Sequence, residues 1–358
     1  MNPSSKTPSW VIRCFQSGDE QGVTGLFRSV FGRLVAEGYW EWKLRSLPTQ
    51  AENEWVAVAD GKIVGHYAVT PVRFKVCDRE FLIPHGCDAM THPGYRRQGI
   101  LSALGRRANE VWGRAGAPFQ IGFHYGGWGS VRERLGWQPV ARLLWVKRWI
   151  RPFASLAQRF RLPGTRIWTR ADSLFNRIRV PKEQDSDFGS AAGRIRLERV
   201  RRAGGQFDRL WERLSSAYGI LAIRDRAWVQ WRYLDMPGVE QQLILASRED
   251  QPLGYIVFRI AQEAGMVRAA IVDCFVAPED TVTLRALVSH AVDEVSGRGA
   301  RSLAALVMPD SPLCGQFLQA AFWKGRHGFD FSVIPYSSTI SDLIAGGWFV
   351  TGAEGDVI

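Results

Sequence analysis

The stretch that decides the fold of this chain leads from an expected strand into an expected helix. It reads His92-Pro93-Gly94-Tyr95-Arg96-Arg97-Gln98-Gly99-Ile100-Leu101-Ser102-Ala103-Leu104. Upstream, Cys87 to Thr91 is short and lies between Gly86 and Pro93, which predicts a strand. Downstream, apolar residues recur at helical spacing, at Ile100, Leu101, Leu104 and Ala108. The segment between them is therefore predicted to be a basic glycine loop that opens a helix.

A loop of this kind is suited to binding a phosphate. The first amides of a helix have no partner within the helix, and they lie at the positive end of its dipole. Arg96 and Arg97 add full positive charges, and Gly99 lets the backbone approach a ligand closely. The sequence therefore predicts an anion site at the start of this helix.

Residues 96–101 resemble motif A of the GNAT acyltransferases, a segment Arg/Gln-x-x-Gly-x-Gly/Ala between a strand and a helix. Leu101 departs from the small residue that is usual at the last position. The surrounding order is similar as well, because Trp55 to Val69 reads as two strands joined by an Asp-Gly turn and Phe119 to Phe123 as a later strand. Arg134 to Trp137 then resembles a common ending of the GNAT domain.

Length and composition favour a soluble enzyme of about two domains. The chain has 358 residues, and its apolar runs are too short to cross a membrane. Residues 1–9 lack the basic and apolar pattern of a signal peptide. The five scattered cysteines and six histidines show no disulfide or metal-ligand spacing, so no metal is expected. The expected location is the cytoplasm.

An internal repeat indicates two copies of one fold. The matching positions have the same spacing in both halves: Trp42, Pro48 and Gly65 in the first, and Trp231, Pro237 and Gly254 in the second. Asp88 to Pro93 likewise corresponds to Asp273 to Pro278. We therefore expect an α/β (α+β) protein with two tandem GNAT-like domains, each a mixed, mostly antiparallel twisted sheet flanked by helices.

The expected domains are a catalytic GNAT domain over 10–146, a basic amphipathic linker over 147–194, a degenerate GNAT-like domain over 195–345 and a tail over 346–358. The second copy carries Glu279 and Asp280 where the first has Arg96 and Arg97. Carboxylates at that position repel a pyrophosphate. We therefore expect the second copy to keep the fold without binding the cofactor.

The linker carries most of the net charge of +11, with ten basic residues and one acidic residue between Lys147 and Lys182. Aromatic and aliphatic residues are interleaved with these charges. Such a segment either lies on an anionic membrane or packs its apolar side on the domains while its arginines stay in solvent. Both interpretations remain open. Nucleic acid is not an expected partner, because the charge is confined to the linker.

The resemblance to the GNAT family implies acetyl-CoA as the acyl donor. In that fold the thioester arm lies between two diverging strands, and the pyrophosphate is bound by the motif A loop. Carried over to this sequence, the cofactor-binding residues are the following: Met90, Thr91, His92, Arg96, Arg97, Gln98, Gly99, Ile100, Leu101 and Ser102.

Three residues are candidates for proton transfer. The resemblance implies that Tyr125, just past the second of these strands, is the acid that protonates the leaving thiolate. If Tyr125 is not the acid, its neighbour His124 is the residue to test next. Asp88 and His85 lie on the first strand, beneath the expected acetyl group, and are candidate bases. For Asp88 a purely structural role at a strand end is equally open. An amide near Met90 is expected to stabilise the oxyanion.

These expectations describe an acetyl-CoA-dependent N-acyltransferase in which an amine attacks the thioester directly. The acceptor is a small-molecule or glycan amine, and the resemblance to tandem GNAT chains of bacterial cell-surface polysaccharide synthesis favours an amino sugar or sugar nucleotide. A non-catalytic acetyl-CoA-binding or membrane-associated scaffold is one alternative. Aminoacyl transfer to a cell-wall precursor is another, but the motif A segment argues against it, because those enzymes need no coenzyme A.

Overall fold

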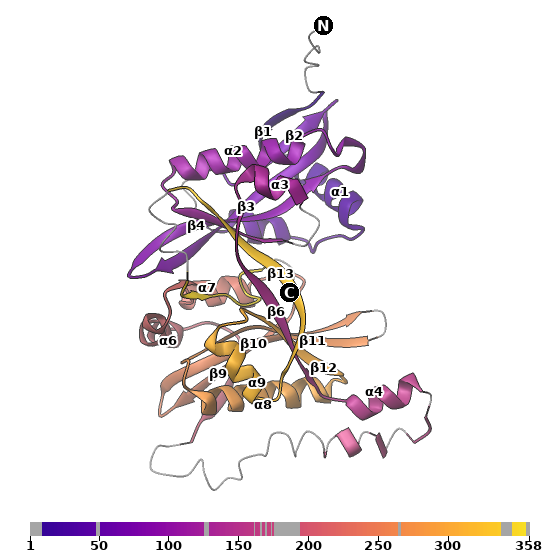
Figure 1. Ribbon diagram of the computed structural model, residues 1–358, viewed down its shortest axis with the longest axis vertical. Helices are drawn as coiled ribbons and strands as arrows, with labels where there is room; N and C mark the ends of the chain where they lie inside the picture. The colour runs from indigo at the N-terminus through magenta and orange to yellow at the C-terminus, as the bar shows by residue number, and fades with distance from the viewer. Residues whose placement is uncertain are drawn as a thin grey trace. The chain divides into compact units, whose positions relative to one another are not determined.

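The computed structural model divides into two compact units (Figure 1). It describes residues 9–47, 51–124, 129–160, 162–164, 167, 168, 170–172, 174, 194–263, 266–337 and 346–355. Unit 1 comprises Met1–Ala141 and Phe329–Gly346, and unit 2 comprises Arg142–Gly328 and Gly347–Ile358. The chain passes between the units within strands β6 (Gln138–Trp149) and β13 (Trp323–Pro335).

The sheet of unit 1 has the strand order β1–β2–β3–β4–β5–β13. Its remaining strands are β1 (Val11–Cys14), β2 (Glu54–Ala59), β3 (Lys62–Val76), β4 (Arg79–Thr91) and β5 (Phe119–His124). All neighbouring strands are antiparallel except β4 and β5, which are parallel. A parallel pair needs a crossover connection, and helix α2 lies within it.

Helices cover both faces of this sheet. They are α1 (Glu20–Phe31), the π-helix η1 (Glu41–Arg45), the short η2 (Pro93–Tyr95), α2 (Ile100–Arg114) and α3 (Gly129–Leu135). Alternation along the strands sends successive side chains to opposite faces. Trp55 and Tyr67 pack with Leu104 of α2, whereas Val56 packs with Leu26 of α1. The two helices thus have separate hydrophobic cores.

Several expectations for this region are confirmed. Asp60 and Gly61 form the turn between β2 and β3 with φ angles of 48° and 72°, and α2 begins at Ile100. The strand expected at Cys87 to Thr91 is longer than predicted, since β4 begins at Arg79 and contains Pro84. Before His85, β4 pairs with β3 and not with β5. Proline is tolerated there because it lies on an edge strand.

The sheet of unit 2 has the order β13–β6–β12–β11–β10–β9–β7. Its strands include β7 (Arg196–Val200), β9 (Gln241–Arg248), β10 (Gln251–Glu263), β11 (Met266–Val276) and β12 (Ser302–Val307), and the short β8 (Ile220–Ala222) and β14 (Trp348–Phe349) pair separately. Its helices are α4 (Pro152–Arg159), α6 (Gln206–Leu214), η3 (Ser215–Ala217), α7 (Arg226–Val229), the π-helix η4 (Gln230–Leu234), α8 (Thr281–Gly297) and α9 (Pro312–Gln319).

The order of elements in unit 1 recurs in unit 2. The run β4, α2, β5 corresponds to β11, α8, β12, and both repeat tryptophans, Trp42 and Trp231, lie in short π-helices. The strand that follows each run in sequence is exchanged between the units. β6, which follows β5, pairs with β12 in unit 2, and β13, which follows β12, pairs with β5 in unit 1. Each sheet is therefore completed by a strand from the other half of the sequence.

A fully buried polar network lies inside unit 2. The carboxylate of Asp273 pairs with Arg224 at 3.0 Å and accepts hydrogen bonds of 2.6, 2.7 and 2.8 Å from the hydroxyls of Tyr233, Tyr255 and Thr351. Arg224 also pairs with Glu354 at 2.5 Å. Burial opposes the charged guanidinium, yet the two carboxylates raise the pKa of Arg224 well above its usual value. Thr351 and Glu354, in the expected tail, therefore belong to this core.

The segment predicted as the linker is partly structured. Strand β6 continues to Trp149, beyond the boundary expected at residue 146, and Arg148 is buried and donates to the Ala320 carbonyl at 3.2 Å. The carboxylate of Asp172 accepts from the Phe153 amide at 2.8 Å, in the first turn of α4. No helix among the described residues is long and apolar enough to span a bilayer.

Candidate active site

The site is organised by the point at which β4 and β5 diverge. The two strands pair only at His85 with Ile121 and at Gly86 with Gly122. Further along, β5 stays paired with β13 and β4 stays paired with β3. At the point of divergence Gly86 leaves no room for a side chain, because a Cβ atom would lie 2.7 Å from the Tyr67 hydroxyl. The diverging ends are thus each supported by a different neighbour.

A bulge at Asp88 shapes the end of β4. The register with β3 shifts between His66 and Ala68, so Tyr67 faces two residues, and Asp88 has a left-handed φ of 48°. A non-glycine residue in that conformation persists only where its surroundings hold it. Two contacts do so: Lys43 Nζ lies 2.6 Å from Asp88 Oδ2, and His66 Nδ1 lies 2.8 Å from the Asp88 carbonyl oxygen.

These contacts continue into a buried chain of polar groups. His66 Nε2 lies 3.1 Å from Glu54, and the other carboxylate oxygen of Glu54 accepts from Arg45 at 2.9 Å. Lys43 and Arg45 both belong to η1, whereas Glu54 and His66 lie on β2 and β3. The π-helix is thereby fixed to the bulged strand at two places. The sequence did not predict this series of buried polar contacts, although Lys43, beside the repeat tryptophan Trp42, is a charged residue at a position expected to be core.

The loop after β4 presents an open helix N-terminus. Arg97 and Gly99 both have left-handed φ angles, 65° and 84°, and Gly99 is the residue directly before α2. No side chain within the described part of the chain caps the first turn of α2. The buried Thr91 Oγ1, at the end of β4, likewise has no hydrogen-bond partner among the described residues. The amides of the first turn of α2 are available to an anionic ligand.

The corresponding helix in unit 2 is closed by its own side chain. Asp280 lies directly before α8, and its carboxylate accepts from the Thr283 amide at 2.9 Å. A carboxylate at this position satisfies a helix donor and places a negative charge where α2 has Gly99. The two helix starts therefore differ in the property that matters for phosphate binding.

Two buried histidines lie on the diverging strands. The ring of His85 packs edge-on against Phe123, with centroids 5.4 Å apart. The ring of His124 packs against Trp137 at 4.5 Å. Burial, and then the positive charge of Arg132, lowers the pKa of His124 to about 4. His124 is therefore a neutral imidazole at neutral pH.

The structure places most of the predicted site residues along one path. His85, Asp88, Met90 and Thr91 lie on β4, and His92 accepts the Gly94 amide through Nδ1 at 3.2 Å. The rest follow in order: Arg96, Arg97 and Gln98 are exposed on the loop, Gly99 precedes α2, and Ile100, Leu101 and Ser102 form its first turn. Tyr125 and the adjoining residues 126–128 lie outside the described residues.

Ile100 fixes where α2 lies on the sheet. A Cβ atom on Gly65 would come within 2.5 Å of the Ile100 side chain. The helix therefore rests directly on β3 at Gly65, and the Ile100 side chain is used for packing. Any contact of Ile100 with a ligand must come from its backbone.

Comparison with known proteins shows what the first part of the chain is similar to. Residues 11–140 match the acetyltransferase (GNAT) domain family. No curated protein matches the sequence. Residues 11–140, which lie in unit 1, are therefore similar to a GNAT acetyltransferase domain.

Solved structures extend the similarity of fold over nearly the full length. A GCN5-related N-acetyltransferase from Anabaena variabilis ATCC 29413 has a TM-score of 0.64 at 12% identity, covering 92% of this chain and 73% of its own. A probable N-acyltransferase from Enterococcus faecalis V583 has a TM-score of 0.62 at 12% identity, covering 92% of this chain and 72% of its own. A GCN5-related N-acetyltransferase from Kribbella flavida has a TM-score of 0.56 at 15% identity, covering 90% of this chain and 70% of its own. The predicted mixed, mostly antiparallel fold is confirmed.

The buried His124 predicts a loss of stability in mild acid. Its pKa falls from 6.5 to about 4 on folding. Between these two pH values His124 is therefore protonated in the unfolded chain and neutral in the folded protein. The free energy of unfolding should therefore drop between pH 6.5 and 4, by on the order of 3 kcal/mol from this group. His124→Gln should flatten that slope in urea unfolding. The exposed His327, changed to Gln, is the control, and equal slopes in both variants would contradict the assignment.

Proposed function

We propose that unit 1 is the catalytic domain of an acetyl-CoA-dependent N-acyltransferase. The observation that carries the proposal is the uncapped start of α2 behind Gly99, directly after a strand that diverges from its parallel neighbour. The match of residues 11–140 to the GNAT acetyltransferase domain supports it. Arg96 and Arg97, both exposed on the loop, supply positive charge for the pyrophosphate of the donor.

The residues present fit acetyl-CoA. The amides of the first turn of α2 are donors for the pyrophosphate region. The acyl donor supplies an activated thioester, whose carbonyl carbon is attacked by the amine of the acceptor. The diverging ends of β4 and β5 hold the thioester arm between them. Gly99 is required for its backbone conformation, since a side chain there meets no neighbour but strains the left-handed φ.

A strand amide of β4 stabilises the oxyanion. The amide of His92 donates to the Val64 carbonyl on β3 at 2.8 Å. Because successive amides of a strand point to opposite sides, the amide of Thr91 is directed away from β3. We therefore assign the oxyanion contact to Thr91, one residue beyond the expected Met90. As the carbon–nitrogen bond forms and the carbon–sulfur bond breaks, the amine loses a proton and the thiolate gains one.

Two residues of β4 remain candidates for the base. Asp88 is held by Lys43 at 2.6 Å, which favours a structural role because the carboxylate is already paired. His85, buried nearer to the point of divergence, is the better candidate. Neutral His124 is a weak base, given its pKa of about 4. The acid that protonates the thiolate is assigned to Tyr125, directly after β5.

Unit 2 is proposed to be a second GNAT-like copy that has lost cofactor binding. The repeated order of elements supports the duplication, and the Asp280 cap on α8 supports the loss of phosphate binding. One coenzyme per chain is therefore expected. The acceptor proposed is an amino sugar or a sugar nucleotide. A cofactor-binding scaffold without turnover remains the alternative, and release of free thiol in the presence of amines distinguishes the two.

The first functional prediction concerns the motif A loop. Replacing Arg96 and Arg97 with glutamate, or Gly99 with valine, should weaken acetyl-CoA binding by about tenfold or more, because charge or backbone geometry at the phosphate site is lost. Isothermal titration calorimetry measures the affinity and the stoichiometry. Asp280→Arg in unit 2 is the matched control and should leave the affinity unchanged. Full affinity in both loop variants would remove the basis of the proposal.

The second prediction concerns the proton donor. Tyr125→Phe removes only the hydroxyl, so turnover should fall about 10- to 1000-fold while acetyl-CoA affinity stays within about twofold. Steady-state release of thiol measures turnover. A Tyr95→Phe variant, changed on η2 between β4 and Arg96, is the control for loss of a hydroxyl. Undiminished turnover in a folded Tyr125→Phe protein would assign the proton to another group.

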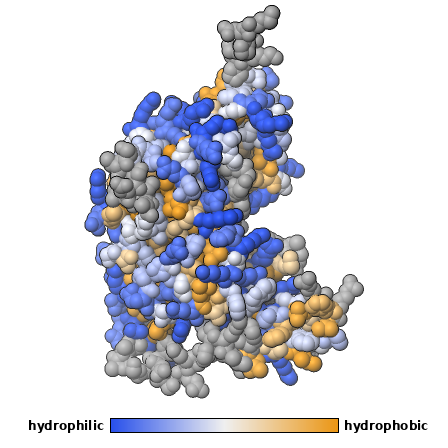
Figure 2. Space-filling model, viewed as in Figure 1, coloured by the Kyte–Doolittle hydropathy of each residue, from blue (hydrophilic) through white to orange (hydrophobic). Residues whose placement is uncertain are grey.

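A surface around α4 is proposed to bind anionic membranes. Large apolar side chains are exposed together there (Figure 2): Leu156, Phe160, Leu162, Ile167 and Leu174. The surrounding sequence is strongly basic, and such a combination suits the interface of a negatively charged bilayer. Arg148 does not contribute, because it is buried in unit 2.

Vesicle binding tests this surface. Vesicles of phosphatidylcholine with phosphatidylserine should sediment the protein at low salt and release it as salt rises, because screening weakens the attraction of each arginine. Changing Leu156 and Phe160 to serine should reduce the bound fraction severalfold. The exposed Val282 on α8, changed to serine, is the control. Equal sedimentation with neutral and anionic vesicles would refute the proposal.

A further inference from the structure

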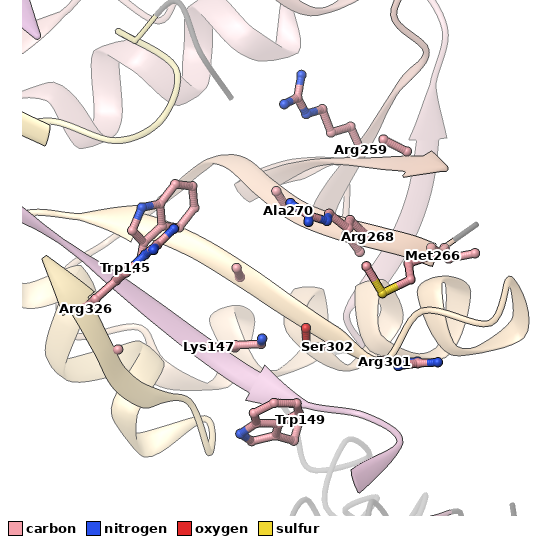
Figure 3. A pocket seen from close by; sticks show the side chains of 15 residues that line it. Trp145, Lys147, Trp149, Arg259, Met266, Arg268, Ala270, Arg301, Ser302 and Arg326 are labelled. Atoms are coloured by element: carbon pink, nitrogen blue, oxygen red, sulfur yellow. The ribbon is translucent and has the colours of Figure 1, made fainter. Parts of the chain in front are cut away.

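A cavity lies wholly within unit 2, on one face of its sheet (Figure 3). Its volume is about 820 Å³, within the range of small-molecule sites. On β6 the lining residues Trp145, Lys147 and Trp149 alternate with Val146 and Arg148, which are buried. Strands β10, β11 and β12 add lining residues beside β6. Gly325 and Arg326 of β13 line it as well, so the floor of the cavity is a sheet surface built from five strands.

The charge of this cavity has one sign. Five of its lining residues are basic: Lys147, Arg259, Arg268, Arg301 and Arg326. No aspartate or glutamate is among the described residues that line it. Partial burial, and then the charge of Arg268, lowers the pKa of Lys147, so the cations disfavour one another. A bound anion would relieve this repulsion.

Two tryptophans add flat apolar surface to the same cavity. Trp145 and Trp149 are four residues apart on β6, which places them about 13 Å apart along the strand on one face. Lys147 lies between the two tryptophans in the sequence. Its Nζ atom is 4.2 Å from the centroid of the Trp149 ring, a cation–π contact. Trp149 is 43% exposed. Its open ring surface can stack on a ring of a ligand.

We propose that this cavity binds a phosphorylated saccharide, with a sugar ring against a tryptophan and two or more phosphates on the basic side chains. The cations come from β6, β10, β11, β13 and the residue before β12, so they surround a compact ligand. A groove for a nucleic-acid strand would instead follow a line along the backbone. The proposal is independent of acyl transfer, because every lining residue belongs to unit 2.

Calorimetry with four probes tests the ligand class. Fructose 1,6-bisphosphate is expected to bind to the full-length protein at low salt, and its affinity should fall as salt is added. Inorganic pyrophosphate, which lacks a ring, should bind more weakly. Maltotriose, which lacks charge, should not bind measurably. A single-stranded oligodeoxythymidine provides the nucleic-acid comparison.

Variants assign the binding to this cavity. Arg268→Glu and Trp149→Ala change exposed side chains and should each weaken binding of the bisphosphate by about tenfold or more, while circular dichroism shows an unchanged fold. Arg285→Glu, an exposed arginine on α8 that does not line the cavity, is the matched control. Glutamates at Arg96 and Arg97 should leave this binding unchanged.

The outcomes separate this proposal from acyl transfer. Loss of bisphosphate binding in the Arg268 variant with acetyl-CoA affinity intact supports the saccharide site whether or not unit 1 is active. The proposal is overturned if the folded protein does not bind the bisphosphate, if Arg268→Glu and Arg285→Glu bind it equally, or if maltotriose or the oligonucleotide binds as tightly.

Discussion

The ion pair between Lys43 and Asp88 is the constraint on which the site in unit 1 depends. Asp88 occupies a left-handed conformation that costs free energy on the order of 1 kcal/mol for a residue with a Cβ atom. The ammonium of Lys43, and His66 at the Asp88 carbonyl, hold it there. Because both partners are buried, loss of either one leaves an unpaired charge, which is far more costly than loss of the pair. The bulge therefore stays where β4 must leave β5.

The two units use the corresponding position in different ways. Asp88 accepts one cation, Lys43. Asp273 also lies beside a register shift, between Val257 and Phe258, but it accepts Arg224, two tyrosines and Thr351. The side chains of Arg224, Tyr233, Tyr255 and Thr351 thus surround Asp273 in unit 2. At the corresponding position in unit 1, the Asp88 carboxylate pairs with Lys43. Together with the Asp280 cap on α8, these contacts satisfy the polar groups at this position of unit 2 from within the chain.

Local signals in the sequence were sufficient for local structure. The Asp60-Gly61 turn and the start of α2 at Ile100 each follow from residues within one turn or one hairpin. The sequence did not show that β4 extends back through Pro84 to Arg79. A proline is tolerated in a strand where that part of the strand has a neighbour on one side only, and this depends on the tertiary structure. The partner of Asp88 and the cavity of unit 2 were missed for a similar reason, since both depend on contacts between distant parts of the chain.

The exchange of β6 and β13 shows why a boundary near residue 146 could not be read from composition. Residues 142–149 are as basic and aromatic as the segment that follows, yet they form the strand beside β12. In return, Asp330 to Pro335 pair with β5 along its whole length. A chain cut at residue 146 would leave the edge of β5 unpaired and exposed beside the predicted active site, and an exposed strand edge is a template for aggregation. Unit 1 is therefore defined by strand pairing across the sequence and not by a contiguous segment.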